Sequence, residues 1–171
     1  MNGFATSQNN QSPCNMEKLE QLKPYENGMD TLFKELYEEF CSSKFRTRSE
    51  LPTYRGVYAF YEKGEPIYIG RANNIRKRIQ WHTRESSGSE SASFAFNLAK
   101  RDYAKSEIAK TRKELMLIEE FLEIFQAHKM NLKNVEFKCI AIENDIIQTM
   151  FEPYLALKLK TYPANNTFEN H

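Results

Sequence analysis

YRGVYAFYEKGEPIYIG, at residues 54–70, holds the local pattern that most constrains the fold of this chain. Its first part, residues 54–62, is rich in aromatic side chains, which favour β-strands. Residues 63–65 contain a glycine and are expected to turn the chain, and residues 66–70 form a second strand-like run. Two such runs joined by a short connection that contains glycine predict a β-hairpin.

Apolar residues at helical spacing predict helices on both sides of the hairpin. Before it, the apolar positions of residues 30–41 share one face, and acids occupy the others. After it, Asn73 or Asn74 is a candidate N-cap for a helix over residues 75–84. Two more helices are predicted, over residues 92–103 and 106–128.

The C-terminal part of the chain predicts one more strand and one more helix. Apolar and charged residues alternate in residues 134–142, as in a strand with one buried face. Asp145 and Gln148 resemble a capping box that opens a helix over residues 146–160. Because Pro153 lies inside that range, we expect the helix to be kinked there or split in two.

This order of elements predicts an α+β fold, with a small, mostly antiparallel three-stranded sheet flanked by helices. The chain has 171 residues, which suits one domain with an appendage. We expect residues 1–53 to form a flexible leader, an N-terminal helix and a basic connector. Residues 54–171 are expected to form the domain proper, with a helical insert at about residues 85–130.

Composition excludes several classes of protein. Hydrophobic residues make up 40% and charged residues 27%, the balance of a soluble globular protein. No apolar run approaches the roughly 18 residues of a membrane helix, and the polar start lacks the pattern of a secretory signal. The three cysteines are widely spaced with no CxxC, which disfavours a disulfide framework or a zinc site. We therefore expect a cytoplasmic protein with no membrane partner.

The net charge of +1 argues weakly against a nucleic-acid partner, but the distribution of charge argues for one. Five basic residues fall within 14 positions that contain no acid: Arg71, Arg76, Lys77, Arg78 and Arg84. A solvated helix surface would explain this run equally well. A second basic group is open to the same two interpretations, and comprises Lys100, Arg101, Lys105, Lys110, Arg112 and Lys113.

Two tyrosine triplets in the hairpin carry a specific resemblance. Gly-Val-Tyr stands at residues 56–58 and Tyr-Ile-Gly at residues 68–70, with the second tyrosine ten residues after the first. This pair resembles the signature of the GIY-YIG nuclease superfamily, with Val57 in place of isoleucine. Either tyrosine alone could be an ordinary strand residue, but the matches continue downstream, at Arg71, Arg78, His82, Glu152 and Asn166.

The resemblance implies a metal-dependent endonuclease that hydrolyses DNA at a single site holding one Mg²⁺ or Mn²⁺ ion. Within it, Tyr58 would be the general base or would position the water, assisted by His82. Tyr68 would orient the attack, and Arg78 would stabilise the transition state. Glu152 would bind the metal. Phosphate or DNA contacts are expected from Arg71, Arg76 and Lys77, and support of the site from Gly56, Gly70 and Asn166, with Asn165 as the alternative asparagine.

These residue types also suit the chemistry on physical grounds. A phenol has a pKa near 10, so a tyrosine needs a neighbouring cation or histidine to act as a base near neutral pH. Arg78 and His82 are four residues apart and share one helix face. An arginine can give paired hydrogen bonds to a phosphate. Glu152 offers the hard oxygen that Mg²⁺ prefers, and a single carboxylate suits one metal ion.

Two other functions remain open from the sequence. A nucleic-acid-binding module of the same fold that has lost catalysis would keep the basic residues, although it would not need the whole set of site residues. An interaction protein is favoured only by the near-neutral net charge. A homodimer is possible, because one site per chain cuts both DNA strands only with two copies or two turnovers.

Overall fold

The computed structural model describes residues 28–103 and 110–166. Contacts divide the chain into two units, residues 1–36 and 37–171. Helix α2 (Met29–Ser42) agrees with the helix predicted over residues 30–41. Residues 1–27, where the predicted flexible leader falls, lie outside the described residues. Within the described part of the chain, no helix is long and apolar enough to cross a membrane.

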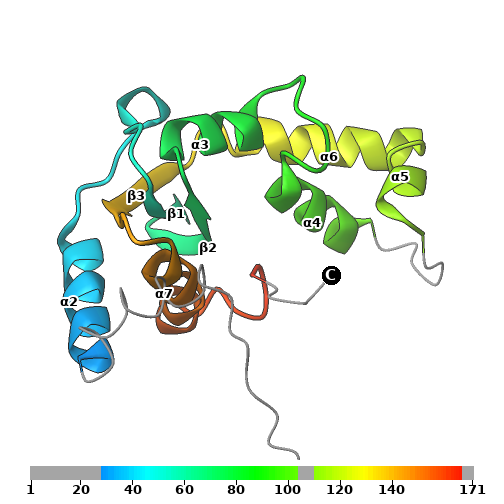
Figure 1. Cartoon of the computed structure of the whole chain (residues 1–171). Coiled ribbons are helices and arrows are strands. Elements are labelled where there is room, and N and C mark those ends of the chain that lie inside the picture. Colours follow the sequence, from blue (N-terminus) through cyan, green and yellow to red (C-terminus); the bar gives the residue numbers. More distant parts are fainter. Residues whose placement is uncertain (1–27, 104–109, 167–171) are drawn as a thin grey trace, which may run out of the picture. The chain divides into compact units, whose positions relative to one another are not determined.

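The sheet has three strands in the order β2-β1-β3, and both pairings are antiparallel (Figure 1). Its strands are β1 (Gly56–Glu62), β2 (Glu65–Ala72) and β3 (Glu136–Ala141). The predicted hairpin and antiparallel sheet are therefore confirmed. The turn is tighter than predicted, because Lys63 and Gly64 both adopt positive φ and Glu65 already pairs with Glu62.

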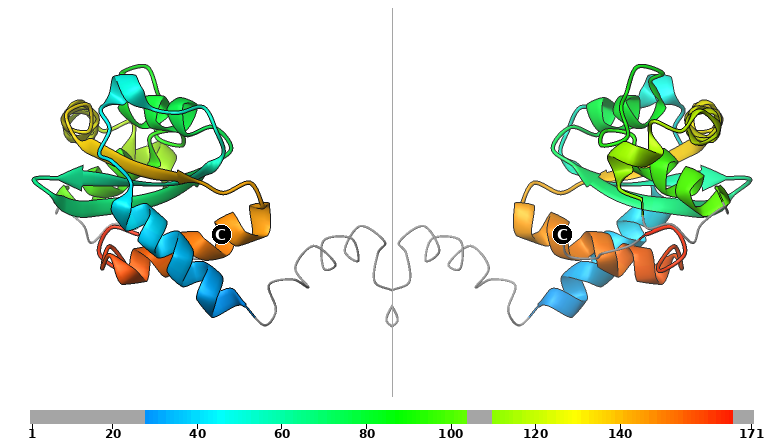
Figure 2. Two further views of the ribbon diagram at one scale, coloured as in Figure 1. Left: turned by 90° about the vertical axis from the view of Figure 1, so that its left-hand side faces the viewer. Right: turned by 90° about the vertical axis from the view of Figure 1, so that its right-hand side faces the viewer.

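Helices cover both faces of the sheet, as the two views of Figure 2 show. Helix α3 (Ile75–Thr83) lies on one face and α7 (Asp145–Lys158) on the other. The first six residues of the central strand β1 are buried without alternation, as expected for a strand covered on both sides. Tyr58 and Phe60 of this strand belong to the main core cluster, together with Ile75 and Ile79 of α3.

Helix α3 begins and ends close to its predicted bounds. Asn74, not Asn73, is its N-cap, because the Asn74 side chain accepts a hydrogen bond from the Lys77 amide at 2.9 Å. Before it, a short 3₁₀-helix, η2 (Arg48–Glu50), interrupts the basic connector. Backbone hydrogen bonds from Ile75 and Arg76 to residues 52–54 fix the start of α3 against the end of the connector.

The helical insert differs from its prediction in one place. Helix α4 (Ser93–Asp102) agrees with the first predicted helix, but the single helix over residues 106–128 is wrong. Residues 104–109 lie outside the described residues, and the rest forms α5 (Arg112–Leu115) and α6 (Glu119–Asn131). At 100° per residue, Leu115 and Phe121 would lie about 120° apart on one straight helix. Both are buried, and the break between them lets each reach the core.

Helix α7 corrects two more details. The capping box of Asp145 and Gln148 is wrong, since Asn144 caps the helix by accepting from the amides of Ile146 and Ile147, each at 3.0 Å. Gln148 is instead buried and donates to the carbonyls of Gly56 and Ala72. The helix is continuous through Pro153 and ends at Lys158, so it is not split. Buried Phe151 and Leu155 hold it against the sheet on either side of the proline.

Candidate active site

Tyr58 and His82 form a buried pair between the sheet and α3. The Tyr58 hydroxyl lies 3.1 Å from His82 Nε2, and both side chains are fully buried. His82 Nδ1 has no hydrogen-bond partner in the described part of the chain. Ile79 and Ile75, about one and two turns earlier on α3, are also fully buried, so the helix docks by its isoleucines and brings His82 to Tyr58.

The two glycines of the triplets are each required for a different steric reason. Gly70 lies opposite Tyr58 in the hairpin, and a Cβ added there would come within 2.5 Å of the Tyr58 Cζ and hydroxyl. A Cβ on Gly56 would overlap the carbonyl oxygen of Ile140 on β3. Gly70 therefore leaves room for the Tyr58 ring, and Gly56 permits the close pairing of β1 with β3.

Arg78 is half-buried and held by the first residues of the insert. Its guanidinium donates to the carbonyl of Ser91 and to the hydroxyl of Ser93, each at 3.2 Å. Ser93 opens α4, so the insert positions an arginine of α3. Neither serine could be identified from the sequence, because neither stands at a position of the tyrosine triplets or of the downstream matches.

Burial decides the protonation of the tyrosines and the histidine. It raises the pKa of Tyr58 well above its usual value and the pKa of Tyr68 to about 12. The Arg78 guanidinium opposes both increases. Burial, and to a lesser extent Arg78, lowers the pKa of His82 to about 3. His82 is therefore neutral near pH 7, and both tyrosines hold their protons unless a further cation approaches them.

A cleft of about 710 Å³ opens beside the buried pair. Tyr68 of β2 and Glu152 of α7 line it, together with Phe94, whose ring stacks on Tyr68 at 4.3 Å between centroids. Since α4 and α7 lie on different faces of the sheet, these residues meet beyond its β2 edge. Four residues of the second basic group also line this cleft: Lys100, Arg101, Lys110 and Arg112. Lys105 lies outside the described residues.

Glu152 faces Arg71 across the mouth of this cleft. Arg71 Nε lies 3.0 Å from Glu152 Oε2, and the Glu152 side chain is 17% exposed. Burial raises the pKa of the Glu152 carboxyl, and the Arg71 guanidinium counteracts part of that effect. No cluster of three His, Cys, Asp or Glu side chains occurs in the described residues. A lone carboxylate in an open cleft fits an ion such as Mg²⁺, which keeps several waters as ligands.

Asn166 closes the outer edge of β2. Its side chain accepts from the Ile69 amide at 3.0 Å and donates to the Ile69 carbonyl at 2.7 Å. Both backbone groups face away from β1, so the asparagine amide replaces a missing strand. Asn165 is directed elsewhere, and accepts a hydrogen bond from Arg101 at 3.1 Å.

Arg76 and Lys77 are not brought to the cleft. Arg76 donates to the carbonyl of Leu51 at 2.6 Å, and the Lys77 ammonium lies 5.1 Å from the centre of the Trp81 ring. Both line a separate groove on the outer side of α3. Of the predicted site residues, Tyr68, Glu152 and Asn166 line the cleft, and Arg71 and Arg78 are bonded to residues that line it. The Tyr58–His82 pair packs against Tyr68, whereas Arg76 and Lys77 lie apart from the cleft.

Comparison with known proteins identifies the family. Residues 54–150, more than half of the chain, match the GIY-YIG catalytic domain. The chain belongs to the GIY-YIG family. The predicted enzyme class is confirmed at the level of this endonuclease family, and the match includes both tyrosine triplets, Arg78 and His82. Glu152 and Asn166 lie beyond the matched range, so their place beside the GIY-YIG triplets rests on the cleft and on the bonds to Ile69.

Individual relatives resemble parts of this GIY-YIG protein. UvrABC system protein C from Deinococcus radiodurans is 50% identical over 44 residues, which is 26% of this chain but 7% of the relative. The chain thus aligns with a small part of that curated protein. A crystal structure of the GIY-YIG N-terminal endonuclease domain of UvrC from Thermotoga maritima, bound to magnesium, is 22% identical, with coverage of 70% and 91% and a TM-score of 0.34. A point mutant of that domain, bound to its catalytic divalent cation, is similar at 22% identity, coverage of 70% and 90%, and the same TM-score.

Proposed function

We propose that this GIY-YIG domain hydrolyses DNA phosphodiester bonds in the cleft between Tyr68 and Glu152. The observation that carries the proposal is that Tyr68 of strand β2 and Glu152 of helix α7, 84 positions apart in the sequence, line one cleft. The buried Tyr58–His82 pair lies beside it. Four basic residues of the insert line the same cleft, which gives the charge that a phosphate backbone requires.

The Tyr58–His82 hydrogen bond suggests how Tyr58 acts as a base. Buried N–H groups without a partner are rarer than buried acceptors without one. Since His82 Nδ1 has no partner in the described residues, the proton belongs on Nε2, and His82 donates to the Tyr58 oxygen. That hydrogen bond stabilises the phenolate relative to the phenol. When cationic charge enters the site, the Tyr58 phenol can release its proton to solvent, and the phenolate can then position a water molecule and accept its proton, while His82 stays neutral.

Arg78 is suited to neutralise the charge that develops on the phosphate. Its guanidinium carries five N–H donors, and the two bonds to Ser91 and Ser93 leave others free for phosphate oxygens. Ser93 lines the cleft, so the anchored guanidinium lies beside the place that the substrate would fill. Donors held in position before the reaction lower the barrier because they need no reorganisation.

Glu152 would hold one Mg²⁺ or Mn²⁺ ion, with water and a phosphate oxygen as the remaining ligands. Such an ion supplies a Lewis acid that polarises the phosphate and acidifies a bound water. In this structure Arg71 donates a hydrogen bond to Oε2 of the Glu152 carboxylate. We infer that Arg71 leaves Glu152 for the substrate phosphate when DNA enters, because its side chain is 45% exposed and free to turn.

The first test is cleavage of supercoiled plasmid in Mg²⁺ or Mn²⁺ by the wild type, Glu152→Ala and Tyr58→Phe. We expect nicked or linear DNA from the wild type and no product from the two variants. Glu62→Ala, an exposed acid at the end of β1, is the matched control and should cleave normally. Both strands are cut only by two copies or two turnovers, so linear product that appears directly would favour a homodimer.

A second candidate is a DNA-binding module without catalysis, and the Arg71–Glu152 ion pair is the observation that favours it. Such a module would bind DNA in a salt-dependent way. It would leave duplex, nicked, branched and single-stranded substrates intact at every metal concentration. A cytoplasmic location also remains a prediction, which fractionation of cells that express the tagged chain would test.

A further inference from the structure

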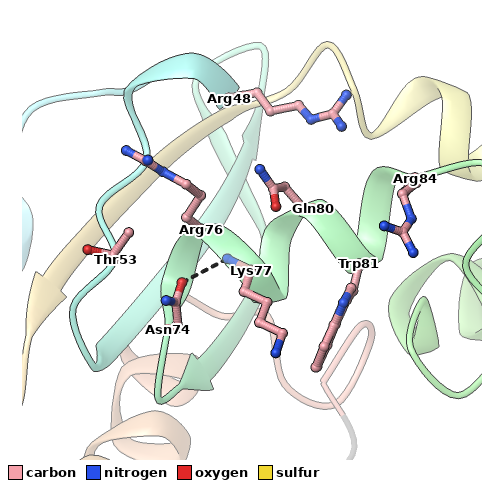
Figure 3. A pocket seen from close by; sticks show the side chains of 8 residues that line it. All are labelled: Arg48, Thr53, Asn74, Arg76, Lys77, Gln80, Trp81 and Arg84. Carbon is pink, nitrogen blue, oxygen red and sulfur yellow. Dashed lines mark hydrogen bonds between the residues drawn. The ribbon is translucent and has the colours of Figure 1, made fainter.

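The outer side of α3 carries a groove that the proposed reaction does not use. It has a volume of about 590 Å³ and lies between η2 and the exposed face of α3 (Figure 3). We call it the α3 outer groove and define it by Arg48, Lys77, Trp81 and Arg84. Three of these residues come from α3 and its C-cap, and at 100° per residue they share one stripe of the helix, about 110° around it from Arg78 and His82.

The charge of the α3 outer groove is entirely positive. Arg48, Arg76, Lys77 and Arg84 line it, and no acid does. None of the four forms an ion pair with a described residue. Glu50, the acid nearest in sequence to Arg48, is bound by the Thr47 amide at 2.8 Å and the Thr47 hydroxyl at 2.9 Å. The groove is therefore suited to a polyanion.

Trp81 adds an exposed aromatic ring to this basic groove. Its side chain is 37% exposed, although Ile79 and His82 beside it are fully buried. Figure 3 shows Trp81 and Lys77 projecting together from α3. A basic groove with an exposed aromatic ring is the combination that binds single-stranded nucleic acid, because phosphates meet the cations and an unpaired base stacks on the ring. Bases within a duplex are already stacked and cannot use it.

We propose that the α3 outer groove binds an unpaired DNA strand, with a base on Trp81 and phosphates on Lys77, Arg84 and Arg48. The inference deepens the proposed function, because it assigns a substrate class to the same domain: DNA with an unpaired segment near the cleaved bond. Arg78 and His82 lie about 110° around the same helix, which with its side chains is about 10 Å across. A strand that spans about 3.4 Å per nucleotide passes from one face to the other within a few nucleotides.

Trp81 allows a direct test, because it is the only tryptophan of the chain. We would titrate the wild-type protein in EDTA with a twelve-nucleotide oligo(dT) and record tryptophan emission and, with a labelled oligonucleotide, anisotropy. Stacking of thymine on the indole should quench the emission with the same binding curve as the anisotropy. A blunt duplex at the same concentrations should leave the emission nearly unchanged.

Variants separate stacking from charge. Trp81→Ala should weaken oligo(dT) binding roughly 5- to 100-fold, and Trp81→Phe should restore much of the loss. Lys77→Ala and Arg84→Ala should each reduce the slope of log K against log salt by about 0.7, the value for one single-strand phosphate. Lys63→Ala is the matched control, since Lys63 lies in the hairpin turn, at the other end of β2 from α3.

The outcomes distinguish this inference from the nuclease proposal. Oligo(dT) binding without a change in Trp81 emission, or groove variants that bind like Lys63→Ala, would overturn the groove assignment and leave plasmid cleavage unaffected. Quenching by oligo(dT) in a wild type that cuts no DNA would sustain the groove while the nuclease proposal fails. If both hold, a branched substrate with an unpaired strand should be cut faster than blunt duplex, and Trp81→Ala should remove that difference.

Discussion

The candidate site has a buried half and an exposed half, and the two halves differ in whether their side chains carry charge. Tyr58 and His82 are fully buried, and burial keeps both neutral. Arg71 and Glu152 lie at the mouth of the cleft, where water and the ion pair support two opposite charges. Charge is thus confined to the part of the site that substrate can reach. Mutations in the exposed half should affect activity, and mutations in the buried half should affect stability as well.

The largest effect is expected from Glu152→Gln in the exposed half. We predict a fall in the cleavage rate of about 10²–10³-fold, the usual cost of losing one stabilising group of the transition state. The unfolding free energy should not decrease, because burial already disfavours the ionised carboxyl, as its raised pKa shows. Cleavage rates and urea denaturation of the same preparations measure both quantities. A variant that is inactive because it unfolds would contradict the division into two halves.

His82 should make the fold sensitive to acid. Its pKa is about 3 in the folded protein and about 6.5 when unfolded, so the unfolded chain binds the extra proton between these values. Stability therefore falls as the pH decreases from 6.5 towards 3, by at most about 1.4 kcal/mol per pH unit from this group. Urea denaturation at pH 7 and pH 4.5 should show a smaller decrease for His82→Gln than for the wild type. Parallel decreases would show that His82 is protonated without cost.

Gly70→Ala tests the packing beneath the Tyr58 hydroxyl. The new methyl group would lie 2.5 Å from the Tyr58 ring, and forcing extra volume into a packed core costs about 1–3 kcal/mol. Gly88→Ala is the matched control, because a Cβ there meets nothing within 4 Å. Thermal denaturation of the two variants should separate them clearly. Equal melting temperatures would mean that the Tyr58 ring can move aside freely.

The smallest effect distinguishes the two neighbouring asparagines. Asn166→Ala leaves the Ile69 amide and carbonyl without partners at the edge of β2, which should cost about 1–3 kcal/mol. Asn165→Ala removes one exposed bond to Arg101 and should change stability by less than about 0.5 kcal/mol. Chemical denaturation of both variants measures the two changes in unfolding free energy. A greater loss of stability for Asn165→Ala than for Asn166→Ala would show that Asn165 supports the site instead.

Local sequence was a good guide to elements that fold with their neighbours. The hairpin and α3 follow from a glycine turn, an asparagine cap and regular spacing of apolar residues, all within about thirty positions. The prediction of a single helix in the insert was wrong because the break between α5 and α6 comes from packing, with no proline or glycine to mark it. The predicted capping role of Gln148 was wrong for a related reason, since its hydrogen-bond partners Gly56 and Ala72 are distant in sequence.

The family and the candidate residues can be identified from the amino-acid sequence alone, because the tyrosine triplets and the spacing to Arg78 and His82 are local patterns on adjacent elements. Which of these residues lie together depends on the tertiary structure. It brought Glu152 to Tyr68, placed Asn166 rather than Asn165 on Ile69, and turned Lys77 away from the cleft. The physical reason is that burial and long-range contacts arise when α7 and the insert pack on the sheet, and no local pattern encodes that packing.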